Sequence, residues 1–99
     1  MFTPLQITQR QLDCYNAHDL DEFCACFSED VEVELMIGNK TLFKGGEALR
    51  QFYGERFSNE ALHAKLISRM AVGQVVIDEE EVTGLPDVSK LSVIAIYEI

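Results

Sequence analysis

The feature that most constrains the fold is a two-residue turn between two strand-like segments. The dipeptide Gly73-Gln74 separates two long segments that are typical of β-strands, and a valine flanks the turn on each side. A two-residue turn with glycine first is common in β-hairpins. It fixes the register of the antiparallel pair, and in this register Arg69 lies directly opposite Asp78. The sequence therefore predicts a long hairpin with a charged pair on one of its faces.

Helix signals near the start of the chain complete the expected order of elements. Thr3 before Pro4 is an N-cap signal, and Asp19 followed by Glu22 resembles a capping box. The expected helices cover residues 4–17, 20–27 and 45–57, and the expected strands cover 30–38, 41–45, 62–72, 75–84 and 91–99. The order α-α-β-β-α-β-β-β, with helices beside one antiparallel sheet, indicates the α+β class. The length of 99 residues fits a single domain over 1–99.

Polar and ionisable side chains gather in residues 15–23, which can be interpreted as a catalytic site or as the joint between two helices. Asp19 and Glu22 fit the joint, because both can cap the second helix. Asn16 and His18 lie at the end of the first helix, where such side chains commonly bond to the carbonyls left free there. These signals favour the structural interpretation.

The charge of the chain limits its partners. The net charge is −9 and the pI is about 4.5, so the surface repels nucleic acids and anionic membranes. The start of the chain lacks the pattern of a signal peptide, and no apolar run approaches the ~20 residues that span a bilayer. We therefore expect a cytoplasmic protein. Its three cysteines are expected to be reduced, and Cys24 and Cys26 lack the partners of a zinc site, so we expect no metal and no cofactor.

Three segments carry a resemblance to a known family. They are YNAHDLDEFCACFSEDVEVE, GGEALRQFY and LHAKLISRMAVGQVVIDEEEVTG. Together they resemble the nuclear transport factor 2-like superfamily, and within it the SnoaL-like and ketosteroid-isomerase-like small bacterial proteins. The resemblance implies a cone-shaped, cystatin-like fold, in which a curved antiparallel sheet wraps around the N-terminal helices and leaves a pocket at the open end. It also implies a homodimer formed through the sheet. Members are enzymes or plain binding proteins, so the fold does not give the activity.

The resemblance allows the ketosteroid isomerase chemistry to be checked residue by residue. That chemistry uses an Asp base and an oxyanion hole made of a Tyr and a protonated Asp. The matching positions hold Leu35 for the base, Gln11 for the Tyr and Ala95 for the protonated Asp. Because all three groups are absent, we do not expect this mechanism. Family members also carry one more strand, whereas this sequence stops at Ile99. We expect either a truncated sequence or a bare sheet edge that favours assembly.

His63, Arg69 and Asp78 are the remaining weak candidates for catalysis. In the predicted register they share one sheet face with Glu80, and the opposite face is more apolar. We therefore expect the charged face to point outward, at the surface or the dimer interface, with a His–Asp or Arg–Asp dyad as the alternative. A β-bulge within residues 78–82 would change the face of the residues that follow.

Large apolar side chains are the candidates for binding a ligand. Leu35 and the helical aromatic residues can line a pocket or fill the core; these are Tyr15, Phe52, Tyr53 and Phe57. Two functions follow. The first is a binding protein for an apolar small molecule, and the second is a SnoaL-like enzyme (isomerase, cyclase or hydrolase) that uses acid–base chemistry. An interior ionisable group at an open cavity would favour the enzyme, and a filled apolar cone would favour the binding protein.

Overall fold

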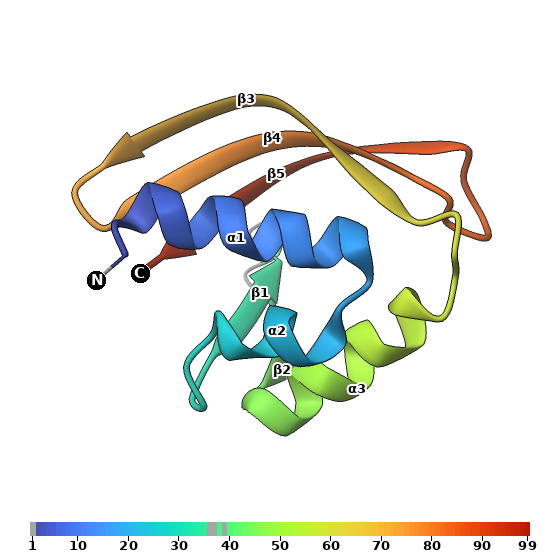
Figure 1. Ribbon diagram of the computed structural model, residues 1–99, viewed down its shortest axis with the longest axis horizontal. Helices are drawn as coiled ribbons and strands as arrows, with labels where there is room; N and C mark the ends of the chain where they lie inside the picture. The colour runs from blue at the N-terminus through green and yellow to red at the C-terminus, as the bar shows by residue number, and fades with distance from the viewer. Residues whose placement is uncertain (1, 36–37, 39) are drawn as a thin grey trace.

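The computed structural model has the predicted order of elements and describes residues 2–35, 38 and 40–99 (Figure 1). The helices are α1 (Pro4–Ala17), α2 (Leu20–Ala25) and α3 (Gly46–Phe57). The strands are β1 (Glu32–Leu35), β2 (Lys40–Lys44), β3 (His63–Val72), β4 (Val75–Thr83) and β5 (Lys90–Glu98). The α+β class predicted from the sequence is confirmed.

Both predicted N-caps are present. The Thr3 hydroxyl accepts from the Gln6 amide, and the Gln6 side chain accepts from the Thr3 amide, which makes a reciprocal capping box at α1. At α2, the Asp19 side chain accepts from the Glu22 amide. Glu22 does not complete that box, because its carboxylate pairs with Arg10 at 2.7 Å. α2 ends at Ala25, two residues before the expected end.

Strands β3, β4 and β5 form one antiparallel sheet, and β1 and β2 form a separate hairpin. The predicted register is confirmed, with Val72 opposite Val75 and Arg69 opposite Asp78. The β-bulge, however, lies in β3 between Leu66 and Ser68, not within 78–82. Bulges bend a strand, and Figure 1 shows the sheet arched over α1, with α2 and α3 on the far side of α1.

The joint between α1 and α2 is fastened to the start of β3. Asn16 donates to the carbonyl of Ala64 (2.9 Å) and accepts from its amide (2.8 Å). His18 ends α1 at a φ of +56°, and its Nε2 lies 2.7 Å from the carbonyl oxygen of Leu62. These side chains therefore bond to the backbone at the start of the edge strand β3 and just before it, and not to the helix-end carbonyls that we expected. The contacts support a structural role for the joint.

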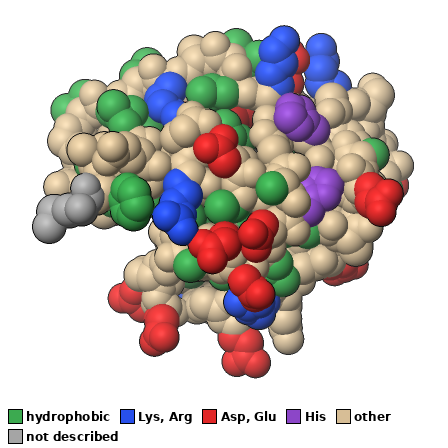
Figure 2. Space-filling view, viewed as in Figure 1, with side chains coloured by type: hydrophobic (Ala, Val, Ile, Leu, Met, Phe, Trp, Pro, Cys, Tyr) green, Lys and Arg blue, Asp and Glu red, His purple; other side chains and the backbone are tan. Residues whose placement is uncertain are grey.

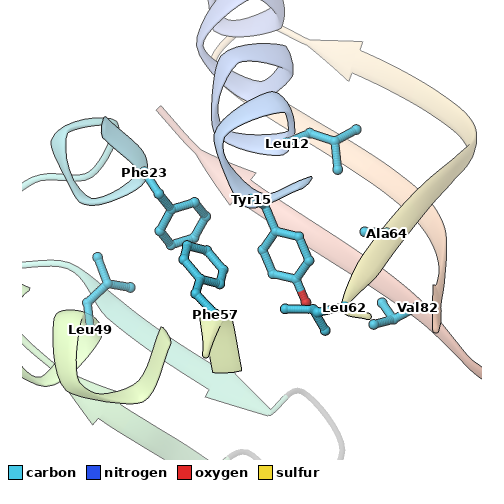
Figure 3. Close-up of a cluster of buried hydrophobic side chains, with 8 residues drawn as sticks. All are labelled: Leu12, Tyr15, Phe23, Leu49, Phe57, Leu62, Ala64 and Val82. Carbon is cyan, nitrogen blue, oxygen red and sulfur yellow. The ribbon is translucent and has the colours of Figure 1, made fainter. Parts of the chain in front are cut away.

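The core lies where the helices meet the inner face of the sheet. Figure 3 shows Tyr15 of α1 between Phe23 and Phe57 on one side and sheet residues such as Val82 on the other. The rings of Tyr15 and Phe57 meet edge to face, with centroids 5.3 Å apart. Such pairs add to the stability that apolar burial gives. None of the helices in the described part of the chain is long and apolar enough to cross a membrane.

Candidate functional site

A cavity of about 620 Å³ lies at one end of the fold, between the C-terminal half of α3 and the loop from β4 to β5. We call it the end cavity. Apolar side chains form much of its wall; they are Phe52, Leu62, Leu85, Pro86 and Val88. Both the volume and the mixture of apolar walls with a few polar groups are typical of small-molecule sites.

Asn59 and Gly84 fix the loop that borders the end cavity. The side-chain Nδ2 of Asn59 donates to the carbonyl of Gly84, and its Oδ1 accepts from the amide of Ala61 at 3.1 Å. Gly84 has a φ of +83°, and a Cβ at this position would overlap the backbone of Ala61. The backbone on this side of the cavity is therefore closely packed and requires glycine.

Of the residues predicted to bind a ligand, one lies in the wall of the end cavity and three belong to the hydrophobic core. Phe52 lies in the wall of the end cavity. Tyr15 and Phe57 are buried in the core, and Tyr53 is packed against the same cluster. Burial raises the pKa of Tyr53 to about 12. The side chain of Leu35 lies outside the described part of the structure.

Arg69 and Asp78 form an ion pair inside the fold, which corrects the expectation that this pair faces outward. The two side chains share two hydrogen bonds, of 2.6 and 2.8 Å. The Asp78 side chain is 0% exposed and that of Arg69 is 14% exposed. Arg69 also donates to Gln9 of α1 at 2.7 Å. The sheet therefore turns its charged face, and not its most apolar face, toward the helices.

Glu80 is buried beside this pair. Within the described residues, its Oε2 has no hydrogen-bond partner. Burial raises the pKa of Glu80 to about 7, and repulsion from Asp78 adds to the effect while Arg69 opposes it. Near neutral pH the carboxyl group is therefore divided between its protonated and ionised forms, as a proton donor or acceptor requires.

Tyr97 connects this region to α1. Its hydroxyl accepts a hydrogen bond of 3.2 Å from Gln11, and burial raises the pKa of Tyr97 far above its ordinary value, with Glu80 adding to the shift. Ala95, which stands where the resemblance places the protonated Asp of the isomerases, lies opposite Asp78 on the neighbouring strand. The interior therefore holds polar groups of its own. We call this set the interior polar layer: Gln11, Arg69, Asp78, Glu80 and Tyr97.

His63 is not part of the interior polar layer. It is exposed at the start of β3, opposite Thr83. The bulge after Leu66 places it on the sheet face opposite to that of Arg69. The strand register thus brings Arg69 and Asp78 together and places His63 on the other face of the sheet.

Metal ligation finds no support in the described residues. Over residues 2–35, 38 and 40–99, no three His, Cys, Asp or Glu side chains gather as metal ligands do. The three cysteines are free and half-buried. On the face shown in Figure 2, Lys and Arg side chains stand among Asp and Glu side chains and do not gather into one basic surface.

Three residues of these two regions were not proposed as site residues from the sequence: Arg56 in the wall of the end cavity, and Glu80 and Tyr97 in the interior polar layer. Glu80 shares one face of β4 with Val76, Asp78 and Val82, because side chains two residues apart point the same way; the sequence does not show that this face is the inner one. Arg56 follows Phe52 by four residues on α3 and therefore lies on the same helix face.

Comparisons with known proteins agree with this architecture. The profile of the SnoaL-like domain matches residues 8–99, and no curated protein matches the chain in sequence. An uncharacterised cystatin fold protein from Novosphingobium aromaticivorans has a TM-score of 0.87 at 23% identity, covering 100% of this chain and 90% of its own. A provisionally named ketosteroid isomerase from Kribbella flavida has a TM-score of 0.79 at 22% identity, covering 94% of this chain and 65% of its own. A provisionally named polyketide cyclase from Sinorhizobium meliloti has a TM-score of 0.79 at 19% identity, and the match covers 99% of this chain and 90% of the cyclase chain.

At these identities the likeness to the solved structures concerns the fold alone. The match to the SnoaL-like domain spans nearly the whole chain and therefore also shows the family. The chain belongs to the SnoaL-like domain family.

Proposed function

We propose that the protein binds a small, mostly apolar molecule in the end cavity. The observation that supports this most strongly is the cavity itself, with about 620 Å³ bounded by apolar side chains of α3 and the following loops. Burying an apolar ligand there contributes roughly 25 cal/mol for each Å² removed from water. The wall is continuous with the core through Leu62, which is 2% exposed.

Filling the cavity mouth is expected to abolish binding. In Val88→Trp a large ring is added at a cavity residue that is 42% exposed, so the core is left intact. A ligand at a hundredfold excess over its Kd stabilises the parent protein by about 2.7 kcal/mol. A thermal-shift screen with apolar small molecules should therefore raise the midpoint of the parent and not that of the variant.

The matched control is Leu42→Trp on β2, where the replaced side chain is 44% exposed and is not in the cavity wall. This variant should respond to ligand as the parent does. A shift that persists in Val88→Trp would place the binding elsewhere.

Acid–base catalysis on such a molecule is the second candidate, and Glu80 is the observation that favours it. A carboxyl group with a pKa of about 7, next to the Arg69–Asp78 pair, is suited to proton transfer at neutral pH. Glu80 is not in the wall of the end cavity, so a substrate would have to pass the side chains that lie between this cavity and Glu80. Tyr15 is one such side chain: burial raises its pKa, Arg56 of the cavity wall lowers it, and Glu80 raises it.

Turnover of a substrate should then follow a pKa near 7 that Glu80→Gln removes together with the activity. If the protein binds apolar molecules but converts none of them, catalysis is rejected and only the binding function remains.

We propose further that two copies pair through the outer face of the sheet. Exposed apolar side chains are contiguous on this face; they are Met70 (64% exposed), Val72 (81%), Ile94 (70%) and Ile96 (44%). Patches of this kind on a small protein commonly mark an interface.

Placing a charge on this face is expected to separate the copies. Ile94→Lys should give a monomer in sedimentation equilibrium where the parent gives a dimer, because a buried unpaired charge opposes association. Because Ile94 is already exposed in the single chain, the variant should still fold. A parent protein that sediments as a monomer would contradict the proposal.

A further inference from the structure

We infer that the end cavity selects molecules with one carboxylate on an apolar body, and that Arg56 binds this carboxylate. The inference rests on the proposed binding function and adds the chemical class of the ligand. It follows from the partners of Arg56, the position of its guanidinium and the composition of the wall.

Arg56 differs from the other arginines of the chain. Arg10, Arg50 and Arg69 each pair with a carboxylate at 2.6 or 2.7 Å. Within the described residues, Arg56 has no carboxylate oxygen within 4.0 Å, although the chain has 17 acidic residues and 8 Lys and Arg residues. A half-buried cation without a carboxylate partner in so acidic a protein is available to an anion from outside.

The guanidinium of Arg56 is held in the cavity wall by an aromatic ring. Its central carbon lies over the ring of Phe52, 4.8 Å from the centroid. A cation–π contact uses the flat face of the guanidinium and leaves the N–H groups at its edge free. The guanidinium also lies near the hydroxyl of Tyr15, which can accept from one of its N–H groups and leaves the others available to a ligand. These edge N–H groups match the two oxygens of a carboxylate.

The remainder of the wall fits the rest of such a ligand. Leu62, Leu85 and Pro86 provide an apolar surface for its body. Glu55 and Asp87 also belong to the wall, are exposed and do not pair with Arg56. Their charges oppose a second negative charge on the ligand, so a monocarboxylate fits better than a dianion such as a phosphate monoester.

The test compares two probes of nearly the same size and shape, one an anion and the other neutral: 4-phenylbutanoate and 4-phenylbutanamide. Affinities are measured by calorimetry for the parent, for Arg56→Gln and for Arg56→Lys. The parent should bind the carboxylate at least about tenfold more tightly than the amide, because hydrogen bonds to charged groups are the stronger ones. Arg56→Gln should lose this preference, while Arg56→Lys should keep part of it.

Arg50→Gln is the matched control. It also removes one positive charge from α3, but its partner is Asp21 and it lies away from the end cavity. It should leave the preference unchanged. Equal affinity for both probes in the parent, or a preference that survives Arg56→Gln, would overturn the inference and leave the binding function intact. Failure of both probes to bind would count against the binding function and, with it, against the inference.

Discussion

Arg69→Met is expected to lower the free energy of unfolding by about 3–5 kcal/mol. The variant leaves the carboxylate of Asp78, which is 0% exposed, without the two hydrogen bonds and the charge that compensate its burial. Burying a charge without a partner is among the most destabilising changes a fold can undergo. Urea unfolding monitored by circular dichroism measures the loss.

Two variants separate the burial of the charge from the mere loss of an ion pair. Arg50→Met breaks a pair whose side chains are 49% and 84% exposed, so it should cost about 0–1 kcal/mol. The double variant Arg69→Met with Asp78→Leu removes both buried charges and should recover most of the lost stability. Equal losses for Arg69→Met and Arg50→Met would show that Asp78 is hydrated in solution.

Glu80→Gln is expected to stabilise the protein by about 3 kcal/mol above pH 7 and to have little effect below about pH 4. The pKa of Glu80 rises from its ordinary 4.5 to about 7 in the folded state, mainly through burial. The folded protein therefore binds this proton more tightly than the unfolded chain does. As a result, the parent loses stability as the pH rises from about 4.5 to about 7. Glutamine keeps the shape of the protonated acid and does not titrate.

The difference in unfolding free energy between parent and variant, measured from about pH 4 to pH 8, isolates this one group from the other carboxylates. Glu79→Gln is the control, because Glu79 is exposed on the other face of the same strand. Its curve should follow that of the parent. A Glu80→Gln difference that stays constant with pH would mean that the carboxyl group titrates normally and is open to water.

Local signals predicted the framework of this fold well. The Gly73-Gln74 turn fixed the strand register because a two-residue connection allows one pairing of its flanks. The cap residues Thr3 and Asp19 located the helix starts, because each satisfies amides that the helix leaves free.

The orientation of the sheet could not be obtained in the same way. Both faces of the hairpin carry apolar residues, and the more apolar one, with Met70 and Val72, lies outside. The inner face buries Asp78 and Glu80, against the usual preference of carboxylates for the surface. The bulge after Leu66 then changes the phase of β3, and no residue type in that segment marks it. The interior polar layer is therefore a product of tertiary packing that alternation alone does not reveal.

The most direct test of the binding proposal is a map of amide chemical shifts during titration with the neutral probe 4-phenylbutanamide. We expect the largest changes at Phe52, Leu62 and Leu85, and almost none in Val88→Trp. No saturable change in the parent, or changes confined to the outer face around Val72 and Ile94, would contradict a ligand site in the end cavity.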